Sequence, residues 1–205
     1  MGTEPAPSIT ICGLTYEEYA SAVRAFHGHL APGMVLGGLL VDLAYRHRPP
    51  GELLDVVCET RTCLPDAVQL LTPCTLGNGG LHLVDLGRFA LTLFAKDTGA
   101  GVRVAVEAGA LGPWPEIAAF LFKQAPKHAQ DTAALLAALL QAGDDILRVE
   151  PVEVDLARLA SRRRAAFAVC PRCGEGYPEA DGEACLGCRG EAPYTVGGAG
   201  SVENG

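Results

Sequence analysis

The first strong pattern of apolar and polar positions predicts two consecutive helices. In the first of them, Tyr19, Val23 and Phe26 fall on one face at helical spacing, after a capping box formed by Thr15 and Glu18. A turn that contains Gly and Pro ends this helix, and a Pro-Pro-Gly sequence ends the second, more apolar one. We therefore expect a tight helical pair near the start of the chain.

The middle of the chain mixes strand patterns with helix patterns. Strands are predicted at 53–58, 89–95 and 102–108, the last two joined as a hairpin, and helices at 65–71, 115–124 and 131–142. The last helix is so rich in Ala and Leu that we expect it to pack on both sides, including against a second copy of the chain. This mixture predicts an α+β core domain.

Composition narrows the classes of function. A net charge of −8 argues against a general affinity for nucleic acid, which needs a basic surface. No stretch predicts a membrane-spanning helix, and the first residues lack the features of a secretory signal, so we expect a cytoplasmic protein. In that compartment eight cysteines favour metal or thiol chemistry over a disulfide framework.

The strongest chemical signal is a pair of Cys-x-x-Cys motifs near the C-terminus. Cys170, Cys173, Cys185 and Cys188 have the spacing of a tetrahedral four-thiolate zinc site. The insert between the pairs is polar, so metal binding must supply most of the stability of this segment. Two disulfides or an iron–sulfur centre are the alternatives. Such modules bind protein, hold a chain terminus in place or bind nucleic acid. The three arginines at 162–164 would suit nucleic-acid binding.

A second signal is the sequence His27-Gly28-His29, which ends the first helix. Two imidazoles at a helix end, followed by a Pro-Gly turn, can converge on one point and serve as a metal-binding or catalytic pair. Helix-capping or surface histidines are the alternative reading.

A third signal surrounds the helix predicted at 65–71. Cys63 precedes this helix, Cys74 follows it, and Asp66 and Gln69 project together from it. A cysteine near a helix start has a lowered pKa, which favours the thiolate as ligand or nucleophile. Buried cysteines of the core are the alternative.

Taken in order, these motifs are similar to those of a known family. A His-Gly-His-x-x-Pro-Gly turn, a Cys-x-x-Asp-Ala-x-Gln helix, a Cys-Thr-x-Gly turn and a terminal four-cysteine module resemble the FmdE family, which is named for a component of formylmethanofuran dehydrogenase. Asp85-Leu-Gly-Arg-Phe-Ala90 is similar to the family's Asp-x-Gly-Lys-x-Ala, and the resemblance runs from about Tyr16 to Cys188. It implies an α+β core, a homodimer, a treble-clef-like zinc finger and a cleft that often holds a metal.

The chain departs from the family pattern at three places. Ala31 stands where the family's turn usually has a cysteine, Arg88 replaces a lysine, and neither Asn78 nor Gly79 supplies the usual lysine of the Gly-rich turn.

The resemblance and the residue types together predict a second metal site in the core. Its candidate ligands are His27, His29, Cys63 and Cys74, because imidazole and thiolate suit a borderline-soft divalent ion. Asp66 and Gln69 would orient these ligands through hydrogen bonds.

These predictions divide the chain into five segments. We expect a flexible arm over 1–12, the α+β core domain over 13–150, a linker over 151–166, the zinc-binding module over 167–190 and a disordered tail over 191–205. The leading function is an accessory or metal-handling protein linked to a molybdenum or tungsten oxidoreductase. The alternatives are a metal- or thiol-dependent enzyme that uses the His/Cys cleft, and a zinc-finger adaptor that binds protein or nucleic acid.

Overall fold

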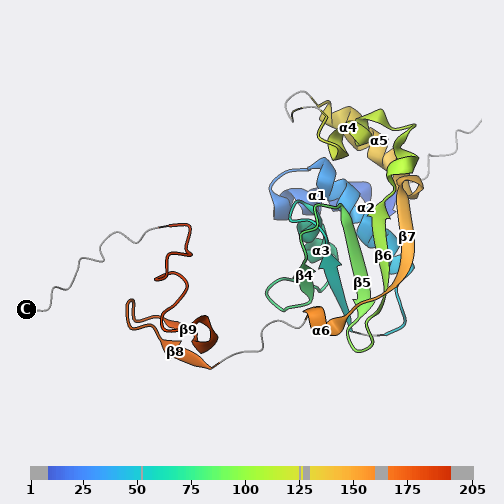
Figure 1. Ribbon diagram of the computed structural model, residues 1–205. Coiled ribbons are helices and arrows are strands. Elements are labelled where there is room, and N and C mark those ends of the chain that lie inside the picture. Colours follow the sequence, from blue (N-terminus) through green and yellow to red (C-terminus); the bar gives the residue numbers. More distant parts are fainter. Residues whose placement is uncertain (1–8, 52, 125, 127–129, 160–165, 195–205) are drawn as a thin grey trace, which may run out of the picture. The chain divides into compact units, whose positions relative to one another are not determined.

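The computed structural model describes residues 9–51, 53–124, 126, 130–159 and 166–194 (Figure 1). The chain forms two compact units, residues 1–156 and 157–205, and each is described by itself.

A mixed five-stranded sheet organises the first unit. Its strands lie in the order β4-β3-β5-β6-β7, and their bounds are β3 Leu54–Cys58, β4 Leu81–Leu83, β5 Ala90–Ala95, β6 Ala100–Val106 and β7 Leu147–Glu153. The edge pair β3–β4 is parallel, whereas the other three pairs are antiparallel. The predicted hairpin is confirmed as β5–β6.

Helices cover one face of this sheet (Figure 1). The two predicted N-terminal helices are α1 Tyr16–His27 and α2 Pro32–Arg46, and α2 and α3 Leu64–Leu71 pack against the strands. The remaining helices, α4 Pro115–Leu121 and α5 Thr132–Ala142, pack against each other, and α5 also packs against α2. Among the described residues, short 3₁₀ segments lie at Ala108–Leu111 and Gly143–Ile146, and the short α6 Leu156–Leu159 begins at the last residue of this unit.

Side chains alternate across the strands, so the two faces of the sheet differ. The face under α2 is apolar, and its Val56, Leu93 and Val104 belong to the main core cluster. On the opposite face, Arg103 faces Glu150 of the neighbouring strand. The sheet is therefore packed on one side and charged on the other, as expected of a two-layer α+β domain.

Glycines let α2 approach both of its helical neighbours. A Cβ added at Gly37 would lie 2.8 Å from the Cβ of Ala67 in α3, and one at Gly38 would lie 2.7 Å from the ring of Tyr19 in α1. The Tyr19 hydroxyl also donates a hydrogen bond to the Met34 carbonyl at 2.6 Å. The three helices therefore form one closely packed group, and this packing brings the end of α1, the start of α2 and the start of α3 together.

Two sequence expectations differ from the structure. The end of the expected arm is ordered, because β1 Thr10–Ile11 pairs with β2 Leu14–Thr15 and the apolar Ile11 is fully buried. Part of the expected linker belongs to the sheet as β7, whose register follows β6 along its whole length. Within one chain, α5 buries one side and leaves Ala133 and Ala137 exposed, so its predicted contact with a second copy stays a prediction. The rest of the linker from 160 to 165, and the tail from 195, lie outside the described residues.

The second unit is small and contains little apolar surface. Its strands β8 Phe167–Val169 and β9 Gly176–Pro178 form an antiparallel pair, followed by a 3₁₀ turn at Glu179–Asp181. Its buried apolar cluster consists of Cys170, Tyr177 and Ala184. A unit with so small a core needs another source of stability.

No single helix within the described ranges is long and apolar enough to cross a membrane. Only α1 and α2 taken together, bent by 119° at their junction, reach the required length and composition.

Candidate metal centre and core thiol cluster

The four C-terminal cysteines converge on one centre. The sulfur atoms of Cys170, Cys173, Cys185 and Cys188 all lie within 4.8 Å of one another, and the Cys173 and Cys185 sulfurs are 3.7 Å apart. Tetrahedral thiolates at about 2.3 Å from a zinc ion stand about 3.8 Å from each other. The donor set therefore fits a four-thiolate zinc site, the arrangement that the sequence predicts.

Two tight turns place these sulfurs. In the first turn, the Gly174 amide donates to the Cys170 carbonyl at 2.9 Å, and Gly174 has a φ of 78°, which a residue with a Cβ rarely adopts. In the second, the Cys188 amide donates to the Cys185 sulfur at 3.3 Å. Each Cys-x-x-Cys pair is thus folded by local hydrogen bonds that point both of its sulfurs inward.

The thiols of this site differ in their tendency to ionise. Backbone N–H donors, that of Cys185 first, lower the pKa of Cys170 to about 6, whereas hydrogen bonding with the neighbouring Cys185 and Cys173 thiols raises the pKa of Cys188 to about 12. Four adjacent thiols cannot all lose their protons without a cation among them. A bound dication replaces those protons and makes all four groups ligands.

The core unit contains a histidine–carboxylate pair. His27, the last residue of α1, places Nδ1 2.7 Å from Oδ2 of Asp66 in the first turn of α3. Gly28 ends α1 with a φ of 89°, as the sequence predicts, and its turn sets the ring centroids of His27 and His29 5.1 Å apart. Asp66 therefore orients His27, one of the roles expected from the sequence.

Cys63 lies on an unusual turn beside this pair. Its φ and ψ are 53° and −50°, and the Leu64 amide donates to the Thr62 carbonyl at 2.5 Å, which makes a γ-turn with positive φ centred on Cys63. Such turns are rare and strained. The start of α2 packs directly against it, since a Cβ at Gly33 would meet the Cys63 sulfur at 2.7 Å. The histidine turn and the Cys63 turn are thus neighbours.

Cys74 does not join this group. Its thiol is buried and donates a hydrogen bond to the Leu54 carbonyl at 3.1 Å, at the first residue of β3. Cys63 follows the other end of β3, and a five-residue strand is about 13 Å long. Gln69 faces away as well, because its side-chain oxygen accepts from the Leu76 amide in the Gly-rich turn.

The expected second metal site is therefore not supported. In the part of the chain that the structure describes, the four C-terminal cysteines are the only group of three or more His, Cys, Asp or Glu residues whose ligand atoms lie close enough together to share one ion. The sequence suggested a shared ion for His27, His29, Cys63 and Cys74 through the family resemblance and through residue types that suit a borderline-soft ion. It contained no signal that Cys63 and Cys74 lie at opposite ends of β3.

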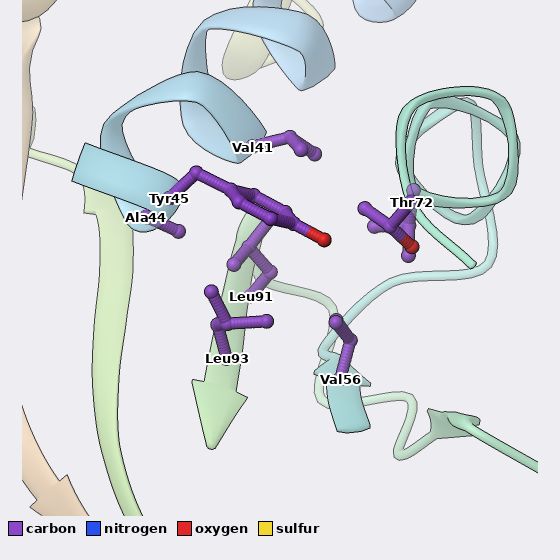
Figure 2. A pocket seen from close by; sticks show the side chains of 8 residues that line it. Val41, Ala44, Tyr45, Val56, Thr72, Leu91 and Leu93 are labelled. Atoms are coloured by element: carbon purple, nitrogen blue, oxygen red, sulfur yellow. The ribbon is translucent and has the colours of Figure 1, made fainter. Parts of the chain in front are cut away.

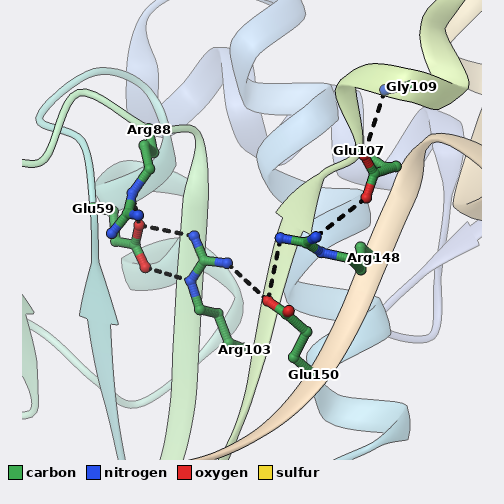
Figure 3. A network of polar contacts seen from close by, with 7 residues as sticks. All are labelled: Glu59, Arg88, Arg103, Glu107, Gly109, Arg148 and Glu150. Atoms are coloured by element: carbon green, nitrogen blue, oxygen red, sulfur yellow. Dashed lines mark hydrogen bonds and ion pairs between the residues drawn. The ribbon is translucent and has the colours of Figure 1, made fainter.

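An ion-pair network on the charged face of the sheet was missed by the sequence analysis, apart from Arg88 (Figure 3). The Arg103 guanidinium contacts both carboxylate oxygens of Glu59, at 2.6 and 2.9 Å, and also Glu150 at 3.0 Å. Arg88 adds a second contact to Glu59, and Arg148 adds one to Glu150. All charged partners of the buried Glu59 come from neighbouring segments of the sheet, so the network joins β3, β6 and β7.

The hollow between α2, α3 and the sheet is not a ligand site (Figure 2). The Tyr45 ring lies across it and its hydroxyl points toward Thr72, while Val56, Leu91 and Leu93 form the floor. The remaining space is too narrow to admit a water molecule.

Comparison with known proteins identifies both units. The family model described as FmdE, molybdenum formylmethanofuran dehydrogenase operon, matches residues 26–154, and the FmdE treble clef zinc finger matches residues 161–195. A solved structure of a tungsten formylmethanofuran dehydrogenase FmdE-like protein from Syntrophus aciditrophicus is 44% identical, with a TM-score of 0.82 over 93% of this chain and 100% of that one.

A curated protein provides a more distant comparison. A probable S-adenosyl-L-methionine-binding protein from Archaeoglobus fulgidus is 38% identical over 93 residues, which are 42% of this chain. The chain spans only about a quarter of that protein, since the match covers 25% of its length.

Proposed function

Because the chain belongs to the FmdE family, we propose that it is a zinc-containing accessory protein that serves a molybdenum or tungsten oxidoreductase. The observation that carries this proposal is the convergence of four thiolates in a unit that matches the family's zinc finger. The link to molybdenum and tungsten comes from the names of the family and of the solved relative.

The zinc site supports a structural rather than a catalytic metal. Four protein thiolates fill the coordination sphere of zinc, so no position is left for a water molecule or substrate. The module therefore contributes a folded surface, and this favours contact with a partner protein over chemistry at the metal. Thiolates of this kind persist in a reducing compartment, which supports a cytoplasmic location.

The exposed apolar side chains of the module agree with a role in protein contact. Phe167 and Val169 are two residues apart on β8, and their side chains are 66% and 70% exposed. Both therefore project from the same face of the β8–β9 ribbon, and aromatic and aliphatic side chains at such positions are typical anchors of a protein interface.

The test is a deletion of the gene in its native host. Loss of the protein should lower the activity and the molybdenum or tungsten content of the partner oxidoreductase, and the wild-type gene should restore both. A Phe167→Ser, Val169→Ser variant that retains its zinc should restore neither. Unchanged oxidoreductase activity and metal content in the deletion strain would contradict the proposal.

A further inference from the structure

The four sulfur ligands of the zinc module differ in their exposure to solvent. Cys170 is 1% exposed and belongs to the buried cluster of the module, Cys185 and Cys188 are half-buried, and Cys173 is exposed. Oxidation of a cysteine by a hydroperoxide depends on its thiolate character and on its exposure. All four groups are thiolates when zinc is bound, so exposure is the property that separates them. Cys173 is therefore the sulfur that a hydroperoxide in solution reaches first.

A second ligand sulfur lies beside Cys173. The Cys185 sulfur is 3.7 Å away, although the two residues belong to different Cys-x-x-Cys turns. A disulfide bond is about 2.0 Å long, so these sulfurs need to approach each other by less than ~2 Å to form one. An exposed thiolate next to a cysteine that can form a disulfide with it is typical of redox-responsive sites.

The charge of the site determines the class of oxidant. Four thiolates around one divalent ion leave two negative charges, and the Glu175 carboxylate lies 3.9 Å from the Cys173 sulfur. Like charges repel each other, so an anionic oxidant is disfavoured at Cys173. A hydroperoxide is small and uncharged at neutral pH and is not repelled.

We propose that Cys173 is an oxidation site for hydroperoxides and that its oxidation releases the metal and unfolds the module. The Cys173 thiolate attacks one oxygen of the peroxide, the oxygen–oxygen bond breaks, and a sulfenic acid and one hydroxide ion form. The Cys185 thiolate then attacks the Cys173 sulfur, the sulfur–oxygen bond breaks, and a disulfide and a second hydroxide ion form. Two electrons pass from the two sulfurs to the peroxide, and protons from the solvent neutralise both hydroxide ions.

Formation of this disulfide removes half of the ligands. Cys173 and Cys185 lose their negative charges, and two thiolates are too few to complete the coordination of zinc. The buried cluster of the module has only three residues, so the unit depends on the metal for its fold. Phe167 and Val169 directly precede Cys170, and they lose their arrangement on β8 when the module unfolds. If this surface binds a partner protein, as the proposed function holds, oxidation releases that partner.

The experiment treats the full, zinc-loaded chain with hydrogen peroxide. A colorimetric chelator follows the release of zinc, and peptide mass spectrometry without reduction identifies the disulfides. About one zinc ion per chain should be released for each Cys173–Cys185 disulfide that forms. The buried Cys58 and Cys74 of the core should stay reduced, and a thiol reductant with added zinc should restore the metal content.

Two histidine variants form a matched pair, because imidazole also binds zinc. Cys173→His should retain zinc but release it to peroxide at least about tenfold more slowly than the wild type. Cys188→His should release zinc within about twofold of the wild-type rate, since it retains both reacting sulfurs. If either variant fails to bind zinc, the disulfides of the wild-type protein decide the question.

Three results would overturn the proposal: zinc release without a Cys173–Cys185 disulfide, disulfides formed only within the two Cys-x-x-Cys pairs, or equal release rates in the two variants. None of these measurements needs a partner protein. A chain that is oxidised as expected, from a host in which deletion of the gene changes nothing, would contradict the proposed function and leave the oxidation site in place.

Discussion

The Nδ1 atom of His27 lies 2.7 Å from Oδ2 of Asp66, although 39 residues separate them in the sequence. This contact joins the end of α1 to the start of α3, on the side where Gly33 of α2 meets Cys63. Both residues could be singled out from the sequence, but their pairing depends on how closely α1, α2 and α3 pack. Helix packing, rather than spacing along the chain, therefore determines which polar residues of the core meet.

Removal of one zinc ligand should unfold the module and leave the core intact. Cys173→Ser or Cys185→Ser is expected to release about one zinc ion per chain, because each thiolate completes the tetrahedron and the apolar cluster of the unit has only three buried residues. Metal analysis and limited proteolysis of residues 166–194 measure this effect. Cys12→Ser, in the core unit, is the control and should retain the metal. Full zinc content in both ligand variants would contradict the four-thiolate site.

The four cysteines could be assigned from the sequence because two turns with fixed local geometry need no knowledge of the rest of the fold. The helix boundaries near Thr15, Gly28 and Pro32 could also be predicted, because a helix cap is formed by residues that are close together in the sequence. The short β4 and the register of the sheet were not, because Leu81–Leu83 is a strand only through its pairing with β3. Cys74 was misplaced for the same reason: its position depends on a contact with Leu54, 20 residues away.

The packing of α2 against α3 should be sensitive to a single methyl group. Gly37→Ala places a Cβ 2.8 Å from that of Ala67, a contact too close to be accommodated without movement of a helix. We expect it to lower the free energy of unfolding by about 1–3 kcal/mol in urea denaturation. Gly112→Ala is the matched control, because no atom lies within 4 Å of the added Cβ and its φ of −52° suits alanine. Equal effects of the two substitutions would show that the glycine contact does not limit the packing.

We predict that the protein is a homodimer, as the family resemblance implies. The side chains that a second copy is expected to cover are large, apolar and exposed on the core unit, and they include Leu53, Leu76, Leu86 and Phe122. Sedimentation at micromolar concentration should give twice the chain mass of 21.3 kDa. A Leu86→Glu, Phe122→Glu variant tests whether these side chains are covered in the dimer and should sediment as a monomer. A wild-type protein that sediments as a monomer at every accessible concentration would contradict the prediction.

Arg103 should contribute far more to stability than Arg148, although both form ion pairs on the same face of the sheet. The side chains of Arg103 and Glu59 are only 15% and 6% exposed, so Arg103→Ala leaves a buried carboxylate with one exposed arginine as its partner. We expect a loss of about 3–5 kcal/mol in the free energy of unfolding. Arg148 and its partner Glu107 are half-exposed, and Arg148→Ala should cost no more than about 1 kcal/mol. Similar losses in urea denaturation would contradict this ranking.

Glu59 should also make the stability of the core depend on pH. Burial by itself raises the pKa of this carboxyl, but the hydrogen bonds and positive charges of Arg103 and Arg88 outweigh burial, so that its pKa in the folded protein lies below the ordinary value of 4.5. A group with a lowered pKa stabilises the folded state fully above its unfolded pKa, and this stabilisation is lost as the pH falls through the folded value. The contribution of Glu59 is therefore complete at pH 6 and decreases below about pH 4.5.

Glu59→Gln should lower the free energy of unfolding at pH 6 and should reduce the further loss of stability on acidification, measured by urea denaturation between pH 6 and 3. Glu116 is exposed on α4, so Glu116→Gln is a control that should leave the loss of stability at low pH unchanged. If Glu59→Gln and wild-type protein lost stability in parallel below pH 4.5, the acid sensitivity would arise from other carboxylates and the assignment to Glu59 would fail.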